Sequence, residues 1–379
     1  MKALTVEELE SFFWSLESEY EVRAPIALQD GTRTLGSLHD GRFAPLGGHV
    51  LYKPVNAFFP QFGEILVLDD QAGSSSRSTT VAEDRDLPEI GSPDGKPLLL
   101  AGLTAEDADC LDFTDRFFST HYRDDVYWGK RETAVIIVIS GRCGRDGEFL
   151  RIAGGKCDIE LIFDGMSYLV SPYSDRGLAL EKRMPLGQES DALPTLERQS
   201  AALSRKDEHT LSKASELIRA NRVPDAFWAR IADRCIACTA CNMVCPTCTC
   251  FDVLDWRQGC TTRRCRVWDS CQYDGFMREA SGHNPLGTET LRTRRRIHHK
   301  LAADVERWGH VTCFLCGRCD EVCPTQIGIM SVSRAIVSEF GSEPEACPAT
   351  GEGAALMAGD RNERQGVVAP CPRTGSSSK

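Results

Sequence analysis

The chain has 379 residues, of which 41% are hydrophobic, and a formal net charge of −11 at pH 7. This length allows two or three domains, and the acidic balance argues against a nucleic-acid-binding protein. The first residues are charged and contain no long apolar stretch, so we predict a cytoplasmic protein without a signal peptide or a membrane span. Eighteen cysteines in such a protein indicate metal binding rather than disulfides.

The N-terminal region begins with a strong helix signal. Thr5 and Glu8 have the spacing of a capping box, and the apolar residues that follow predict a helix over residues 4–18. Asp30-Gly31 is a dipeptide typical of a two-residue hairpin turn, which predicts a pair of short strands around it.

Short apolar segments predict further strands in this region. They lie at residues 62–68, 97–103, 133–140, 157–163 and 167–171. Thr104 is a predicted N-cap of the helix that follows the second of these strands. Residues 70–96 are rich in Ser, Gly and Pro, and we expect a mobile surface loop there. Residues 1–205 are therefore predicted to form a mixed α/β domain.

The second domain, residues 206–340, is predicted to be mainly helical. Helices are expected at 211–220, 224–232 and 297–308. The last of these lies in the long insert between two cysteine runs, residues 246–312, and favours a helical domain over a compact, β-containing ferredoxin. Residues 341–379 show little periodicity and are predicted to be a mostly disordered tail. The overall fold class is therefore α+β.

Two cysteine runs with identical spacing are the most specific signal in the chain. The first run comprises Cys235, Cys238, Cys241 and Cys245, followed by Pro246. The second run comprises Cys313, Cys316, Cys319 and Cys323, followed by Pro324. The pattern C-x2-C-x2-C-x3-C-P is that of bacterial ferredoxins and predicts two [4Fe–4S] clusters. Zinc sites usually pair two C-x2-C units and lack the final Cys-Pro.

In this pattern the fourth cysteine of each run binds the other cluster, because the chain turns away at the proline. The predicted ligands of the first cluster are Cys235, Cys238, Cys241 and Cys323. The predicted ligands of the second cluster are Cys313, Cys316, Cys319 and Cys245.

Four other residues near the runs have two interpretations each. Cys248, Cys250 and Cys271 either form a third metal site or pack against the clusters, and packing is the simpler interpretation. His283 either caps a helix or donates a hydrogen bond to a cluster sulfur, and no further ligand is needed while eight cysteines suffice.

Three more cysteines are not expected to bind metal. Cys260 and Cys265 lie in a polar segment and are interpreted as thiols outside the metal sites. Cys110 lies on the predicted apolar face of the helix after Thr104, which places it in the core.

A basic run precedes the second cysteine run. It comprises Arg292, Arg294, Arg295, Arg296, His298, His299 and Lys300. The run either offsets the negative charge of the clusters or binds an acidic partner, and the alternative is a solvated helix face.

The segments around the cysteines resemble one family of iron–sulfur subunits. The resemblance is carried by residues 245–250 (CPTCTC), 268–271 (WDSC) and 282–285 (GHNP), and more weakly by 55–60, 64–66 and 98–118. These segments are similar to the beta subunit of cytoplasmic nickel–iron (sulf)hydrogenases and to the A subunit of anaerobic sulfite reductase. The resemblance covers about residues 40–340.

The chain departs from this family at two places. The family often carries a cysteine-rich segment after the strand that matches residues 133–140, and here only Cys143 and Cys157 remain. Cys347 and Cys371 in the tail have no counterpart.

The resemblance implies an electron-transfer subunit between a flavoprotein subunit and a subunit with a catalytic metal. The sequence contains no P-loop, dinucleotide-binding or nucleophile-elbow motif, so we expect no catalytic residues and no turnover by the chain alone. Two alternatives remain: an enzyme subunit whose N-terminal domain binds a flavin or a substrate directly, and a cluster-based redox sensor.

Overall fold

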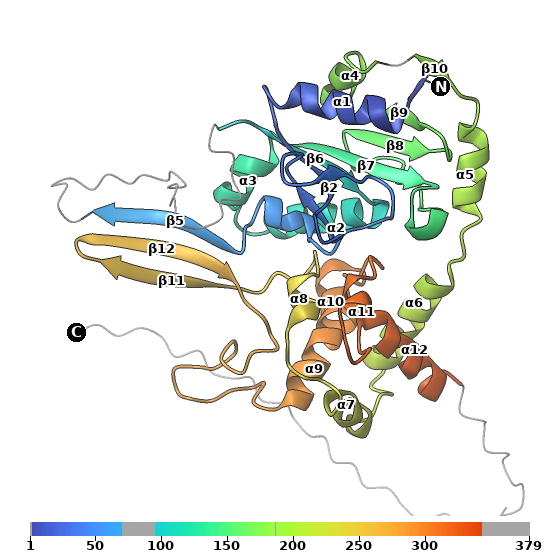
Figure 1. Cartoon of the computed structure of the whole chain (residues 1–379). Helices are drawn as coiled ribbons and strands as arrows, with labels where there is room; N and C mark the ends of the chain where they lie inside the picture. The colour runs from blue at the N-terminus through green and yellow to red at the C-terminus, as the bar shows by residue number, and fades with distance from the viewer. Residues whose placement is uncertain (1, 70–94, 186, 343–379) are drawn as a thin grey trace, which may run out of the picture. The chain divides into compact units, whose positions relative to one another are not determined.

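In the computed structural model of the protein, which describes residues 2–69, 95–185 and 187–342, the N-terminal region folds around a nine-stranded sheet (Figure 1). The strand order is β10-β1-β9-β8-β7-β6-β2-β3, with β4 paired to β2. The strands are β1 (Lys2–Leu4), β2 (Glu21–Ala27), β3 (Arg33–Gly36), β4 (Arg42–Phe43), β6 (Leu98–Leu103), β7 (Val135–Gly141), β8 (Ile159–Phe163), β9 (Tyr168–Pro172) and β10 (Gln188–Glu189). The central strands β2, β6, β7 and β8 are parallel, and the outer pairs are antiparallel.

The side chains of β7 are apolar on both of its faces, so the sheet is covered on both sides. Val135, Ile137 and Ile139 belong to one apolar cluster, while Ile136 and Val138 belong to another. Successive side chains of a strand point to opposite faces, so an uninterrupted apolar strand needs cover on both. The helices of this region are α1 (Val6–Leu16), α2 (Ala105–Phe117), α3 (Asp125–Arg131), α4 (Asp175–Glu181) and α5 (Leu193–Ala201). Helix α1 packs in the first cluster and α2 in the second, on opposite faces of the sheet (Figure 1).

The predicted local signals of this region are confirmed. Thr5 and Glu8 form the reciprocal capping box of α1, and Thr104 forms one with Asp107 at the start of α2. The Asp30-Gly31 turn joins β2 and β3. The predicted loop at 70–96 lies outside the described residues except for 95 and 96, as does the predicted tail beyond residue 342.

A second, three-stranded sheet was not predicted. Strands β11 (Phe251–Gln258) and β12 (Thr261–Trp268) form a hairpin, and β12 also pairs with β5 (Phe62–Asp69). Figure 1 shows the three strands side by side, away from the larger sheet. The expectation that the insert between the cysteine runs is helical is therefore wrong for residues 251–268. Most of β11 is exposed, so its side chains lack the apolar alternation that marks a half-buried strand.

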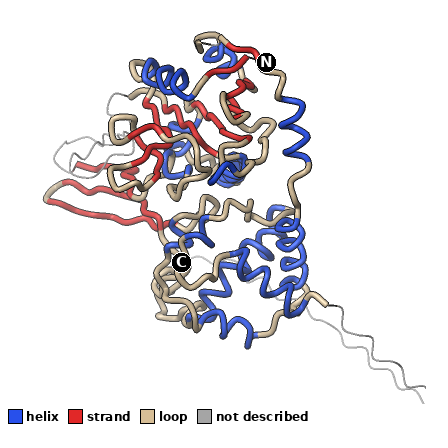
Figure 2. Tube along the Cα trace, turned by 45° about the vertical axis from the view of Figure 1, so that its right-hand side comes forward, coloured by secondary structure: helices blue, strands red, loops and turns tan. Residues whose placement is uncertain are grey.

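The cysteine runs lie in a mainly helical region (Figure 2). Its helices are α6 (Lys206–Arg219), α7 (Asp225–Ala232), α8 (Ala240–Met243), α9 (Glu289–His298), α10 (Asp304–Trp308), α11 (Arg318–Glu321) and α12 (Ile329–Phe340), with a π-helical segment at His299–Ala303. Apolar side chains of α6, α7, α9 and α12 form one core cluster, and Cys235, Cys313, Cys319 and Cys323 pack against it. The predicted helix at 297–308 starts earlier, at Glu289, because Thr288 caps it.

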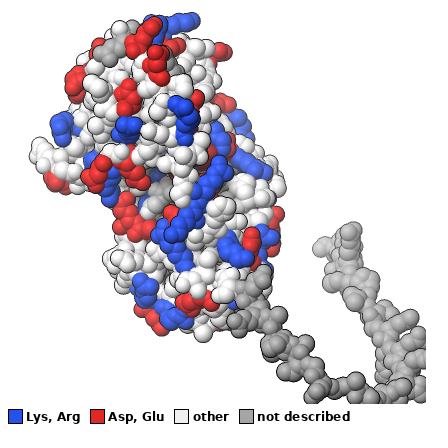
Figure 3. Space-filling view, turned by 90° about the vertical axis from the view of Figure 1, so that its right-hand side faces the viewer, with Lys and Arg blue, Asp and Glu red and all other residues white. Residues whose placement is uncertain are grey.

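The predicted boundary near residue 205 falls between α5 and α6, and the division into two domains there stays a prediction. Basic and acidic side chains are interspersed on the face of the molecule in Figure 3. Among the described residues, no helix is long and apolar enough to cross a bilayer.

Candidate metal centre

The two cysteine runs have the same backbone conformation. Ala237 and Thr239, on either side of the second cysteine of the first run, have φ values of 52° and 59°. Leu315 and Gly317 occupy the same positions in the second run, with φ values of 62° and 78°. A non-glycine residue in this left-handed region costs about 1–3 kcal/mol, and such strain concentrates at ligand clamps. The two runs therefore share one local backbone conformation around their second cysteine.

Four cysteines from both runs line one cavity of about 400 Å³, which we call site A. They are Cys235, Cys238, Cys241 and Cys323. The last cysteine of the second run therefore lies with the first three of the first run, as predicted for the first cluster.

The other four cysteines form a second group, which we call site B. It comprises Cys245, Cys313, Cys316 and Cys319. Burial raises the pKa of the Cys313 thiol to about 12, and the nearby thiols of Cys316 and Cys245 act in the same direction. Cys245 also influences the pKa of Cys316 and of Cys319. The structure thus brings together both predicted sets of four, while their ligation of iron stays a prediction.

Hydrogen bonds to sulfur make both sites suitable for clusters. The backbone N–H of Ile327 donates to Cys323 Sγ at 3.4 Å, and that of Ile329 donates to Cys319 Sγ at 3.4 Å. Such bonds stabilise thiolate ligands and tune the reduction potential of a cluster. The described residues contain no compact group of His, Cys, Asp or Glu for a single metal ion. Four ligands that surround a cubane stand farther apart than those of one ion.

Part of the basic run is buried between the two sites. Arg296 and Lys300 are each 5% exposed, and they lie one helical turn apart. Arg296 Nη2 donates to Ile327 O at 2.5 Å, and Lys300 Nζ donates to Thr247 Oγ1 at 2.6 Å. Burial lowers the pKa of Arg296, but nearby thiols of both runs raise it more. The largest of these contributions come from Cys241 and Cys319. Because buried charges need a counter-charge, these cations fit anionic clusters.

For the basic run as a whole, the structure confirms neither a role in binding clusters or a partner nor a solvated helix face. Arg294 is partly exposed and pairs with Asp225 at 2.9 Å. The solvated-face interpretation is therefore wrong for Arg296 and Lys300, and also for Arg292, which is buried and pairs with Asp274 at 3.1 Å.

We expect Arg296→Gln to lower the reduction potentials of both clusters, on the order of tens of millivolts, because a nearby positive charge favours the reduced form. Redox titration followed by EPR spectroscopy measures the two potentials. Arg294→Gln is the matched control, and its shift should be much smaller. Equal shifts in both variants, or unchanged potentials in Arg296→Gln, would contradict the assigned role of Arg296.

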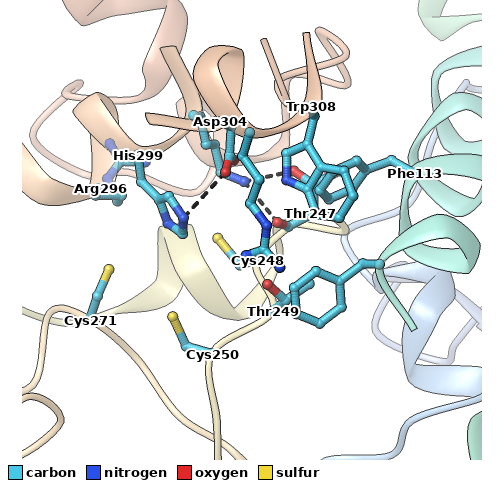
Figure 4. A pocket seen from close by; sticks show the side chains of 13 residues that line it. Phe113, Thr247, Cys248, Thr249, Cys250, Cys271, Arg296, His299, Asp304 and Trp308 are labelled. Carbon is cyan, nitrogen blue, oxygen red and sulfur yellow. Dashed lines mark hydrogen bonds and ion pairs between the residues drawn. The ribbon is translucent and has the colours of Figure 1, made fainter. Parts of the chain in front are cut away.

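A second cavity, of about 460 Å³, lies beside site B. Cys248, Cys250 and Cys271 line it together with Arg296 and Lys300 (Figure 4). The hydrogen bond with the Cys250 thiol lowers the pKa of Cys271 to about 6, against the effect of burial. We call this space the three-thiol cavity. His283, by contrast, is exposed on a turn and lines neither cavity, so its predicted contact with a cluster stays untested.

Three cysteines outside both runs and the three-thiol cavity differ in burial and contacts. Cys110 is buried in α2, as predicted, and its thiol forms a hydrogen bond with Cys316, which lowers the pKa of Cys316. Cys265 is buried in β12, and Cys260 is exposed at the hairpin turn. No sequence pattern links Cys110 to the second run, so this contact appears only in the folded chain.

A buried ion pair joins the second run to α2, and it was missed in the sequence. Arg318, between Cys316 and Cys319, is fully buried, and its Nη1 lies 2.5 Å from Asp107 Oδ1. Nη2 donates to Asp107 Oδ2 at 2.9 Å, and Nε donates to Val50 O at 2.7 Å. Both charges therefore have partners, and the pair fixes the second run against the N-terminal region.

Comparisons with known proteins agree with this geometry. Residues 234–327 match the 4Fe-4S dicluster domain. Sulfhydrogenase 2 subunit beta of Pyrococcus furiosus is 40% identical over 101 residues, which cover 26% of this chain and 30% of the relative. The chain thus matches less than a third of that relative's length, and no solved structure gives a significant match. The chain contains a 4Fe-4S dicluster domain, whose motifs imply two [4Fe–4S] clusters, and over about a quarter of its length it is homologous to a sulfhydrogenase beta subunit.

Proposed function

We propose that the chain is the electron-transfer subunit of an oxidoreductase complex, in which sites A and B each bind one [4Fe–4S] cluster. The observation that carries the proposal is the grouping of eight cysteines into two crossed sets of four, with Arg296 between them. Each cluster, when bound, exchanges one electron with little structural change. Arg296 and Lys300 stabilise the charge, and the N–H groups of Ile327 and Ile329 hold the thiolates.

Site A is the proposed point of contact with a partner protein. Cys238 is exposed, and Ile236 beside it is 63% exposed. Both line the cavity of site A, so a redox partner that covers Ile236 comes close to the cluster. An exposed apolar side chain next to an electron-transfer site suits a small, transient interface. The proposed partners are a flavoprotein subunit on one side and a catalytic metal subunit on the other, as in hydrogenase-like or sulfite-reductase-like complexes.

The isolated chain should therefore accept and return electrons but turn over no substrate. We expect full, reversible reduction of both clusters by a low-potential viologen, followed by anaerobic spectroscopy. Hydrogen oxidation, sulfite reduction and nicotinamide reduction should appear only after partner subunits are added. Turnover by the chain alone, abolished by a substitution in residues 40–205 that leaves the clusters intact, would instead support direct flavin or substrate binding by the N-terminal region.

A further inference from the structure

The three-thiol cavity is not used by the proposed two-cluster function. Its cysteines come from two segments that the β11–β12 hairpin brings together. Phe251 pairs with Trp268 at the base of the hairpin, and the N–H of Asp269 donates to Cys250 O at 2.9 Å. The chain therefore returns to Cys250 just before Cys271, and the two thiols come within hydrogen-bond contact.

Cys248 completes the group. It lies two residues before Cys250, and its thiol forms a hydrogen bond with that of Cys245 in site B. Figure 4 shows the sulfur atoms of Cys248, Cys250 and Cys271 directed toward a common space below His299. We propose that these three cysteines bind a third iron–sulfur cluster next to site B. The proposal goes beyond the proposed function and does not depend on the partners named there.

The size of the cavity supports a cluster rather than simple packing. The three-thiol cavity is open to solvent and has a volume of about 460 Å³, and the cavity of site A, which is also open, has about 400 Å³. Thiols that only pack against a neighbouring cluster would be surrounded by side chains, because protein interiors are close-packed. The cavity is instead similar in size to that of a predicted cluster site, and three thiols line it, which suits a prosthetic group.

The charges around the cavity favour an anionic group. Arg296 and Lys300 line it, and their hydrogen bonds go to the neutral oxygens of Ile327 and Thr247. Lys53 is also buried close by: its Nζ lies 3.7 Å from the centre of the Trp268 ring, and Cys248, Cys245 and Cys250 interact with its charge. A cubane of charge 2+ with three thiolates carries a net charge of −1, and the cavity places it near cations that also face the thiols of sites A and B, with Asp304 as a carboxylate in the same lining.

Asn242 and His299 supply further polar contacts in the three-thiol cavity. Asn242 Nδ2 donates to Cys271 Sγ at 3.3 Å, in the same way that backbone N–H groups donate to sulfur in sites A and B. His299 lines the cavity, and its Nε2 lies 3.3 Å from Asp304 Oδ1. A histidine held by a carboxylate is a frequent metal ligand, so His299 is available for the iron that no cysteine binds.

Assembly of this core of charge 2+ uses two ferrous ions, two ferric ions and four sulfide ions from the medium, and each of the three thiols releases its proton to solvent as its Fe–S bond forms. Reconstitution of the full chain with iron and sulfide under anaerobic conditions therefore tests the proposal. We expect about 12 iron and 12 sulfide per wild-type chain, from three Fe4S4 cores. The triple variant Cys248→Ala/Cys250→Ala/Cys271→Ala should hold about eight of each and keep the EPR signals of sites A and B.

The matched control is Cys143→Ala/Cys157→Ala/Cys260→Ala, which removes three thiols that line neither cavity and should keep the wild-type iron content. A second measurement uses the wild-type chain alone, so it does not depend on the folding of a variant. Iodoacetamide under anaerobic, native conditions should leave Cys248, Cys250 and Cys271 unmodified until a chelator removes iron, as read by peptide mass spectrometry.

A wild-type chain with about eight iron, in which these three thiols react before chelation or Cys250 and Cys271 form a disulfide, would overturn the third cluster and leave sites A and B intact. Absence of both cluster signals from sites A and B, with the three thiols still protected by iron, would instead reject the proposed function and support this inference. The two proposals therefore fail in different ways.

Discussion

Replacing Cys323 with serine is expected to disrupt the cluster of site A, although Cys323 belongs to the second cysteine run. The reason is that Cys323 lines one cavity with Cys235, Cys238 and Cys241. Replacing Cys245 should likewise disrupt the cluster of site B. Each variant should lose up to about four iron per chain, and EPR spectra of the reduced protein should show the change in only one centre.

Two reference variants identify the centres independently of crossed ligation. Cys238→Ser removes an undisputed site A residue, and Cys316→Ser removes a site B residue. The Cys323→Ser spectrum should match that of Cys238→Ser, and the Cys245→Ser spectrum should match that of Cys316→Ser. The opposite matching would mean that each run binds its own cluster with all four cysteines.

The second large effect is expected at the buried ion pair of Asp107 and Arg318. Asp107→Ala leaves the guanidinium of Arg318 fully buried without its counter-charge, which typically costs about 3–5 kcal/mol. This is a large part of the 5–15 kcal/mol that stabilises most domains. The free energy of unfolding, measured by anaerobic urea denaturation of the full chain, should fall by that amount.

Two control variants separate the effect of the unpaired charge on stability from the loss of other interactions. Asp107 also accepts a hydrogen bond from the N–H of Thr104 in the capping box, so Thr104→Ala estimates the cost of the cap, about 1 kcal/mol. Asp207→Ala breaks the exposed pair with Arg334 and should cost less than about 1 kcal/mol. If Asp107→Ala costs no more than either control, the buried pair does not stabilise the chain as described.

Local signals allowed much of the fold to be predicted. The capping boxes at Thr5 and Thr104 and the turn at Asp30-Gly31 depend on residues within three positions of one another. The apolar run of β7 requires a buried strand wherever it lies in the sheet. The cysteine spacing likewise specifies the cofactor by itself, so the sequence predicts two [4Fe–4S] clusters without any tertiary contact.

The features that could not be predicted depend on distant contacts or on helical phase. The basic run is visible in the sequence, but the phase of α9 and of the π-helical segment at His299–Ala303 decides that Arg296 and Lys300 face the cysteines while Arg294 pairs with Asp225. The contact between Cys250 and Cys271 depends on the β11–β12 hairpin, and its mostly exposed strand β11 shows no alternation of apolar and polar residues. Arg318 reaches Asp107 across 211 positions of the chain, and no local signal links the two residues.

The pairing of β5 with β12 has a consequence for synthesis of the protein. Leu66 of β5 pairs with Arg264 of β12, so β5 leaves the ribosome long before its partner strand exists. Until then the segment FGEILVLD has an unpaired edge of high β-propensity, which is the kind of strand that associates with other chains. Fragments that end before residue 261 keep that edge permanently, so we expect them to aggregate during expression, while chains that extend through Trp268 cover it.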